Sequence, residues 1–170
     1  MFCWEWDGAK PDGIILGKAL SGGLYPVSAF LANDEIMGVF KPGDHGSTFG
    51  GNPLGAAIGL ASLKVLVEEK LPERANELGN WFMGELRKIK APHIKDVRGR
   101  GLLIGVELTG PARPWCEALA DRGILCKETH DHVVRFAPPL TVSKQDLEWA
   151  MQQVREVLAM SLEPAMAGAH

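Results

Sequence analysis

The sequence predicts a fold of mixed class, an α/β segment over residues 1–71 followed by a compact α+β unit over residues 72–170. Near the N-terminus a short apolar strand leads to a lysine in a glycine-rich loop, and a later helix is apolar around most of its circumference. After Lys70 the pattern changes to amphipathic helices and short strands, which places the domain boundary near Lys70–Pro72. We therefore expect residues 1–71 to be one part of a larger α/β domain.

The first part contains short strands and turns before one long helix. The apolar run before Lys18 predicts a buried strand. Asn52 is a suitable N-cap and Pro53 fits the first helical position, so a helix is expected to begin there. A helix that is apolar on most sides is buried in a larger structure. In chain order we expect strands over residues 13–17 and 27–31, with a glycine-rich loop over residues 21–26 between them, and a helix over residues 54–70.

The second part alternates helices and strands. Leu78, Phe82 and Leu86 recur at helical spacing, and Gly123 closes a later helix. Ser143, followed by Asp146, has the character of a capping box and opens the last helix. We expect helices over residues 72–90, 114–122 and 143–162, strands over residues 97–108, 124–127 and 133–136, and a frayed tail over residues 164–170.

Composition excludes several classes of function. The 170 residues are 46% hydrophobic and 23% charged with a net charge of −3, which is typical of a globular domain. No long basic run indicates nucleic-acid binding, and no apolar stretch approaches the ~18 residues that span a membrane. Cys3, Cys116 and Cys126 are odd in number and lack metal-ligand spacing, so they predict reduced thiols. We expect a soluble, cytoplasmic protein that binds no metal.

Lys18 is the first candidate for chemistry. Three large apolar residues lead to it and glycines flank the run, so the sequence predicts an amine held in a confined site. Desolvation of a lysine favours its neutral form, which can form a Schiff base with the aldehyde of pyridoxal 5′-phosphate (PLP). The alternative is a lysine at a strand end whose ammonium simply reaches solvent.

A second candidate is the run GSTFGGNP over residues 46–53. Its small residues expose backbone N–H groups, the hydroxyls of Ser47 and Thr48 add donors, and a helix N-terminus follows. Such a loop suits an anion, most naturally a phosphate. Glycine–serine turns also precede many helices that bind nothing. The phosphate interpretation is supported by Lys18 upstream, because PLP needs both an amine and a phosphate site.

The third candidate is Arg135, which lies in the apolar run VVRFAPPL over residues 133–140. An arginine within a buried strand is unfavourable unless its guanidinium is paired. The planar fork of a guanidinium matches a carboxylate bidentately, so a substrate carboxylate is one candidate partner. A structural ion pair with an acidic side chain is the other.

These segments, in this order, resemble the class III, fold-type I, PLP-dependent aminotransferases. Within that family the resemblance is strongest to the ornithine aminotransferases, with acetylornithine and other ω-amino acid transaminases as alternatives. The family's fold implies the C-terminal end of a PLP-binding large domain, over residues 1–71, and a small α+β domain, over residues 72–170. The matching stretches are residues 16–29, 41–55, 97–103 and 135–140.

The resemblance also implies roles for single residues. Lys18 corresponds to the lysine that binds PLP and moves the proton between the substrate Cα and the cofactor. Thr48, with Ser47 beside it, corresponds to the phosphate contact that this family makes across a homodimer interface. Arg135 corresponds to the arginine that pairs with an α-carboxylate. The implied reaction transfers the δ-amino group of L-ornithine to a 2-oxo acid and yields glutamate 5-semialdehyde and an amino acid.

Members of the family are much longer than this chain. The resemblance therefore implies a C-terminal portion, without the glycine-rich loop, the stacking aromatic and the acid that pairs with the pyridine nitrogen. We expect the 170 residues to be inactive alone and the apolar helix over residues 54–70 to favour self-association. A non-catalytic truncated fragment is the alternative to a part of a working enzyme.

Overall fold

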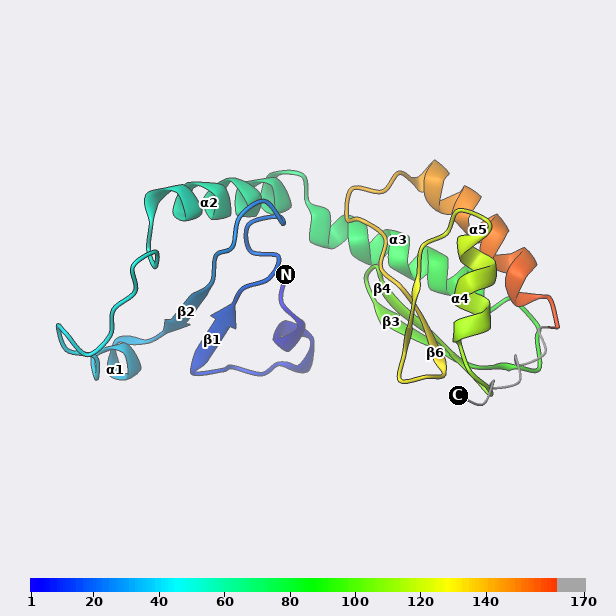
Figure 1. The fold of residues 1–170 in the computed structure, drawn as a ribbon, viewed down its shortest axis with the longest axis horizontal. Coiled ribbons are helices and arrows are strands. Elements are labelled where there is room, and N and C mark those ends of the chain that lie inside the picture. The colour runs from blue at the N-terminus through cyan, green and yellow to red at the C-terminus, as the bar shows by residue number, and fades with distance from the viewer. Residues whose placement is uncertain (162–170) are drawn as a thin grey trace, which may run out of the picture. The chain divides into compact units, whose positions relative to one another are not determined.

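The structure is a computed structural model that describes residues 1–161 (Figure 1). The chain divides into two compact units, unit 1 over Met1–Lys70 and unit 2 from Leu71 onward. We describe each unit by itself. The tail predicted over residues 164–170 and the last predicted turn of the final helix, at residue 162, lie outside the described residues.

Unit 1 contains a two-stranded antiparallel sheet and one long helix. Ile15 of the first strand pairs with Phe30 of the second. The predicted helix start is confirmed, because the Asn52 side chain accepts a hydrogen bond from the Gly55 N–H at 2.8 Å. The elements are η1 (Cys3–Asp7), β1 (Gly13–Leu16), β2 (Ala29–Ala32), α1 (Asp34–Met37) and α2 (Pro53–Glu68).

Large apolar side chains of unit 1 remain exposed. Ile15 in β1 is 83% exposed, and Leu60 and Val67 in α2 are 57% and 61% exposed. The buried residues among 1–70 are Ser21 and two glycines of α2, so this unit contributes nothing to the hydrophobic core. The prediction of a buried strand before Lys18 is therefore wrong for the described chain, because Ile14 and Leu16 are only half-buried and Gly13 and Ile15 are exposed.

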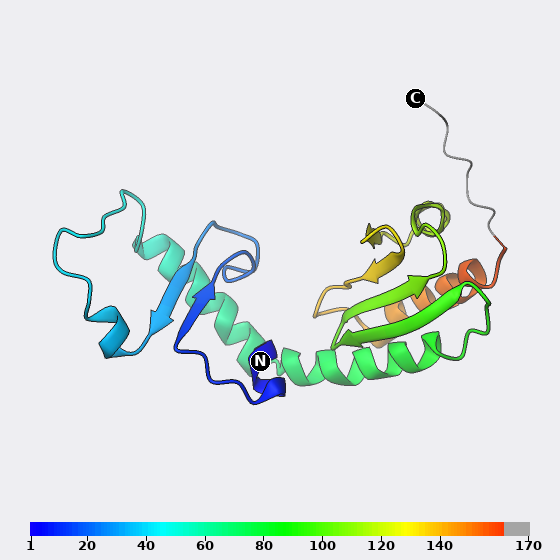
Figure 2. The ribbon, with the colours of Figure 1, turned by 90° about the horizontal axis from the view of Figure 1, so that it is seen from below.

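Unit 2 is a four-stranded antiparallel sheet with three helices on one face (Figure 2). The strand order is β3-β4-β6-β5, so the last hairpin joins the sheet through its second strand. The predicted single strand over residues 97–108 is a hairpin, which turns at Gly101 with a φ of +51°. The elements are α3 (Leu71–Leu86), β3 (Ile94–Arg100), β4 (Leu103–Leu108), α4 (Arg113–Ala120), β5 (Lys127–Thr129), β6 (Val133–Phe136) and α5 (Lys144–Leu158).

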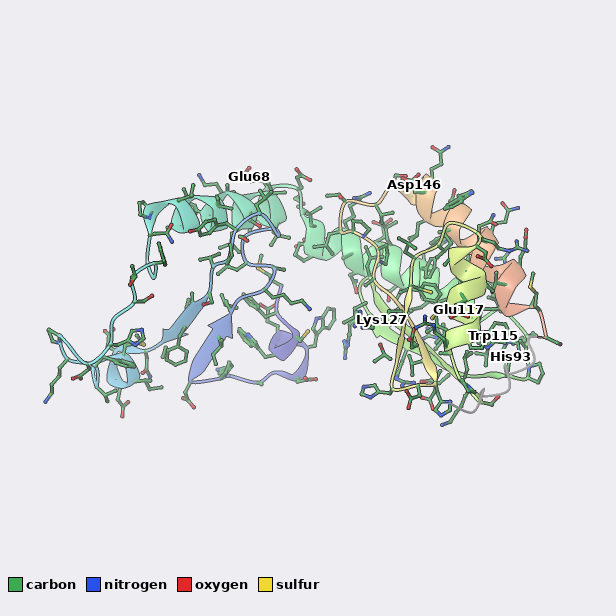
Figure 3. The ribbon with its side chains drawn as sticks, in the orientation of Figure 1. Glu68, His93, Trp115, Glu117, Lys127 and Asp146 are labelled. Atoms are coloured by element: carbon green, nitrogen blue, oxygen red, sulfur yellow. The ribbon has the colours of Figure 1, made fainter. Side chains whose placement is uncertain are left out.

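Unit 2 carries the hydrophobic core. Alternate strand residues such as Val106 and Val134 are fully buried against the helices. At the edge of this core the His93 ring stacks on Trp115 with centroids 4.2 Å apart (Figure 3). The His93 Nε2–H donates to the Leu158 carbonyl at 3.0 Å, which caps the end of α5. These contacts fix the ends of α4 and α5 beneath the sheet.

The closest backbone approach involves two glycines. A Cβ added at Gly79 in α3 would lie 1.9 Å from the Gly101 carbonyl oxygen in the β3–β4 turn. Real Cβ atoms are not found so close to backbone, so the helix and the turn require glycine at residue 79. This contact sets how near α3 lies to the sheet.

Candidate functional site

Lys18 lies in a tight turn directly after β1. Its φ is +52°, in the left-handed region that disfavours residues with a Cβ, and the Leu20 N–H closes the turn on the Gly17 carbonyl at 3.1 Å. Such strain persists where the surroundings fix the backbone, and it is common at functional positions. The side chain is exposed, so the confined environment predicted from the sequence is absent from the described chain.

Ser21 organises the loop that follows Lys18. It is 1% exposed, its hydroxyl donates to the Tyr25 carbonyl, and it accepts from the Tyr25 N–H at 3.2 Å. The loop lies on a face of α2 that is bare at Gly55 and Gly59, where a Cβ at Gly55 would be 3.3 Å from the Tyr25 ring. The Tyr25 ring and the Leu20 carbonyl of the lysine loop therefore lie against these two glycines of α2, a tertiary contact that no sequence motif predicted.

A pocket of about 920 Å³ lies within unit 1. Lys18 and Leu20 contribute to it from the lysine loop, and Gly55 and Gly59 contribute from α2. The segment from Phe49 to Asn52 also lines it, so the second half of the predicted anion loop and Lys18 share one pocket. Small residues and backbone dominate the side nearest the start of α2.

Ser47 and Thr48 do not line this pocket. The Ser47 hydroxyl accepts a hydrogen bond from the Gly50 N–H at 2.9 Å, which folds residues 47–50 into a tight turn. Asn52 donates to the Phe49 carbonyl at 2.8 Å and so fixes the turn to the start of α2. Both hydroxyl-bearing residues are exposed.

Arg135 lies on β6 in unit 2, on the face of the sheet that the helices leave open. Its neighbours Val134 and Phe136 are buried on the helix side, whereas Arg135 is exposed. The expectation of a guanidinium buried among apolar strand residues is therefore wrong, because strand alternation turns this side chain outward. Its cross-strand partners are Gly105 on β4 and Lys127 on β5.

The open face also carries a group of ion pairs on β3 and β4. Glu107 accepts from Lys95 through Oε1 and from Arg98 through Oε2, the latter at 2.6 Å. Arg98 also donates to Asp96 at 2.9 Å. Hydrogen bonds from Lys95 and then Arg98 hold the pKa of the Glu107 carboxyl below its ordinary value.

The structure brings two of the three cysteines together. Cys116 on α4 is buried, and Cys126 before β5 packs against the same core. The Cys126 thiol donates a hydrogen bond that lowers the pKa of Cys116, while the same contact raises the pKa of Cys126. Their spacing in the sequence does not predict this contact, because the fold-back after Gly123 that joins them is a tertiary feature.

Two kinds of feature are absent from residues 1–161. In this range no three His, Cys, Asp or Glu side chains form a group that could hold a metal ion. No helix there has the length and apolar character to cross a membrane.

The comparison with protein families decides the classification. The sequence model of the class-III aminotransferases matches residues 1–158. The chain belongs to this family. It is 59% identical over 159 residues to an ornithine aminotransferase of Geobacillus sp. (strain WCH70) and 60% identical over 157 residues to one of Bacillus subtilis (strain 168). These alignments cover 94% and 92% of the chain, respectively.

Solved structures agree with the classification. The crystal structure of an acetylornithine aminotransferase from Elizabethkingia anophelis matches with a TM-score of 0.86 and 46% identity, over 91% of this chain and 42% of that one. The chain spans about 40% of the length of the curated relatives it matches. This partial coverage agrees with the expectation that the chain corresponds to one portion of a family member.

Proposed function

We propose that this chain belongs to a PLP-dependent aminotransferase that transfers the δ-amino group of L-ornithine to a 2-oxo acid, with glutamate 5-semialdehyde and an amino acid as products. The observation that carries the proposal is the position of Lys18. It lies on a strained backbone at a pocket shared with the glycine loop before α2, in a chain 59% identical to an ornithine aminotransferase. The proposal applies to the protein of the relatives' length.

The residues present fit PLP. The cofactor needs an amine for its aldehyde and donors for its phosphate. The pocket offers Lys18 from one loop and the backbone N–H groups of Phe49 and Gly51 from another, because those of Gly50 and Asn52 already bond within the turn. When bound, PLP withdraws electrons from the substrate Cα and so stabilises the carbanion. The bare surface at Gly55 and Gly59 keeps the pocket open beside the lysine.

The chain's own residues would contribute binding, orientation and proton transfer. Lys18 holds the cofactor and moves a proton at the substrate Cα. Ser47 and Thr48 do not line the Lys18 pocket, so we assign them to the phosphate of a second subunit across a homodimer interface. Arg135 pairs with a substrate carboxylate, because its guanidinium is exposed and can bind one.

The same proposal includes the domain assignment. Unit 1 corresponds to the C-terminal part of a PLP-binding large domain, and unit 2 corresponds to the small α+β domain. We place the protein in the cytoplasm. The exposed apolar faces of β1 and α2 then pack against other parts of the assembled enzyme, which is why the 170 residues alone are expected to be inactive.

A chimera tests the function. Residues 1–158 replace the matched segment of the Bacillus subtilis ornithine aminotransferase, and the product is assayed for glutamate 5-semialdehyde from L-ornithine. We expect activity, fixation of PLP to Lys18 by borohydride, and loss of both in Lys18→Ala. Lys10→Ala is the matched control, because it removes an exposed lysine upstream of β1. An inactive but folded chimera, or fixation at other lysines, would contradict the proposal.

Acetylornithine transamination is the second candidate, favoured by the 46% identity to the Elizabethkingia anophelis enzyme. The same 158 residues are placed in that host, and kcat/KM is compared between the two hosts for L-ornithine and N-acetylornithine. If the segment is suited to ornithine, the chimera in the Bacillus subtilis host has the higher kcat/KM of the two. The opposite result would favour the acetylornithine assignment.

A further inference from the structure

The chain folds back after α4, so that the segment leading into β5 runs along this helix. The Ile124 N–H donates to the Leu119 carbonyl at 2.9 Å near the turn, and farther on the Arg113 guanidinium bonds to Glu128 at 2.9 Å. Over residues 123–128 the even-numbered residues are half-buried and the odd-numbered ones are exposed. Alternate residues of an extended segment share a face, so the half-buried residues lie on the α4 side.

Cys116 and Cys126 occupy the middle of this contact. Cys116 lies about one helical turn from each of the two α4 residues that hold the segment, and Cys126 lies midway between the two residues that they hold. Cys116 is 6% exposed, and Cys126 packs half-buried against the same core. A hydrogen bond joins their thiols. Figure 3 labels Glu117 and Lys127, which directly follow the two cysteines in sequence.

The surroundings of the pair favour reaction at Cys116. The hydrogen bond from Cys126 holds the pKa of the Cys116 thiol below its ordinary value, and the charge of Arg113 acts in the same direction, although burial and two nearby carboxylates oppose them. The thiolate is the nucleophilic form of a cysteine. Cys126 is the more exposed of the two, so a molecule as small as hydrogen peroxide can reach the pair beside it.

We propose that Cys116 and Cys126 form a peroxide-reactive thiol pair that closes into a disulfide between α4 and the start of β5. The Cys116 thiolate attacks one oxygen of hydrogen peroxide, the O–O bond breaks, and a sulfenic acid and hydroxide form. The hydroxide takes up the proton that Cys116 had lost. The Cys126 sulfur then displaces the sulfenic oxygen, which leaves as water with the Cys126 proton. Two thiols and one peroxide thus give one disulfide and two waters.

The neighbouring thiol makes this oxidation reversible. A sulfenic acid without a nearby thiol is oxidised further to sulfinic acid, whereas a disulfide can be reduced again. The disulfide also fastens β5, an edge strand that pairs with β6 alone, to α4. Cys3 is the remaining cysteine, and it is exposed in unit 1, which contains no second thiol.

Peptide mapping of the 170-residue chain tests the proposal. Trypsin cleaves after Arg122, so Cys116 and Cys126 lie on separate peptides, residues 101–122 and 123–127. After treatment with equimolar hydrogen peroxide and alkylation of the remaining thiols, we expect mass spectrometry to detect these two peptides joined, and to find them separate after reduction. The link should form about tenfold faster in the folded chain than in concentrated urea, which removes the alignment of the two thiols.

Two variants assign the roles within the pair. Cys126→Ser removes the resolving thiol, so dimedone should trap a sulfenic acid on Cys116 and no joined peptide should form. Cys3→Ser is the matched control, because it removes an exposed thiol outside unit 2, and it should give as much joined peptide as the parent chain.

Three results would each overturn the proposal. The first is an oxidised parent chain in which peptides 101–122 and 123–127 stay separate. The second is a link that forms as fast in urea as in the folded chain. The third is a Cys126→Ser chain with neither a dimedone adduct nor a sulfinic acid on Cys116. These experiments use no PLP and no substrate, so their failure is distinct from failure of the chimera assay.

Discussion

Replacing Gly79 by alanine tests the closest contact in unit 2. The added Cβ would lie 1.9 Å from the Gly101 carbonyl oxygen and 2.3 Å from its carbonyl carbon. Both atoms belong to backbone, so no side-chain rotation relieves the overlap. To reach ordinary contact, α3 and the turn must separate by roughly 1.5 Å.

That separation acts on a packed core. Leu78 and Phe82 lie beside residue 79 on α3 and are nearly fully buried, so moving the helix weakens their contacts with the sheet. Overpacking of a well-packed site destabilises by about 1–3 kcal/mol, and a clash with backbone belongs at the upper end. We expect about 3 kcal/mol, equivalent to a decrease of about 12–24 °C in Tm for a unit of this size.

Gly84→Ala provides the matched control on the same helix. Nothing lies within 4 Å of a Cβ at Gly84, so alanine there should be neutral or stabilise by about 0.5 kcal/mol through helix propensity. Urea unfolding followed by far-ultraviolet circular dichroism measures both variants. The reasoning is refuted if Gly79→Ala unfolds at the same urea concentration as Gly84→Ala.

Three further predictions concern single side chains. The pKa of Glu107 is below its usual value of 4.5 in the folded chain, so the unfolded chain binds a proton first as the pH falls. The free energy of unfolding should therefore decrease below about pH 4.5, and urea titrations should show a shallower decrease for Glu107→Gln; an unchanged slope would argue against the ion pairs. Asp131 has a φ of +59°, so Asp131→Gly should raise the Tm of unit 2 by several degrees, and a lower Tm would count against backbone strain in this turn. Ser21→Ala removes both hydrogen bonds to Tyr25 and should destabilise the Lys18 loop by about 1–3 kcal/mol, seen as faster exchange of the Tyr25 amide; retained protection would exclude this role.

Local signals in the sequence predicted local structure well. The start of α2 could be predicted because Asn52 and Pro53 carry the capping information within two residues. The end of α4 near Gly123, which has a φ of +81°, follows from the same kind of signal. The three-residue strand β5 was predicted too early, at residues 124–127, because its position depends on pairing with β6 and its own sequence hardly specifies it.

Burial and tertiary proximity were harder to predict at the site. Lys18 was expected in a confined place because apolar residues precede it, yet its side chain is exposed. A run of apolar residues indicates which segment can be buried, but it does not identify the part of the protein that covers it. Arg135 was expected to be buried for the same reason, and strand alternation placed it on the open face instead. The cross-strand neighbours of Arg135, Gly105 and Lys127, are identified by the sheet register and have no sequence motif of their own.

The lack of a hydrophobic core in unit 1 has a calorimetric consequence. The heat capacity change of unfolding follows the apolar surface that becomes hydrated, and in unit 1 much of that surface is hydrated already. The heat capacity change of unfolding for a monomer of this chain should therefore be near that of unit 2 alone, about 1.1–1.4 kcal/mol/K for roughly 90 residues. A chain of 170 residues folded around one core would give about 2.0–2.6 kcal/mol/K. The difference between the two heat capacity changes measures how much apolar surface of unit 1 remains to be buried by contacts outside this chain.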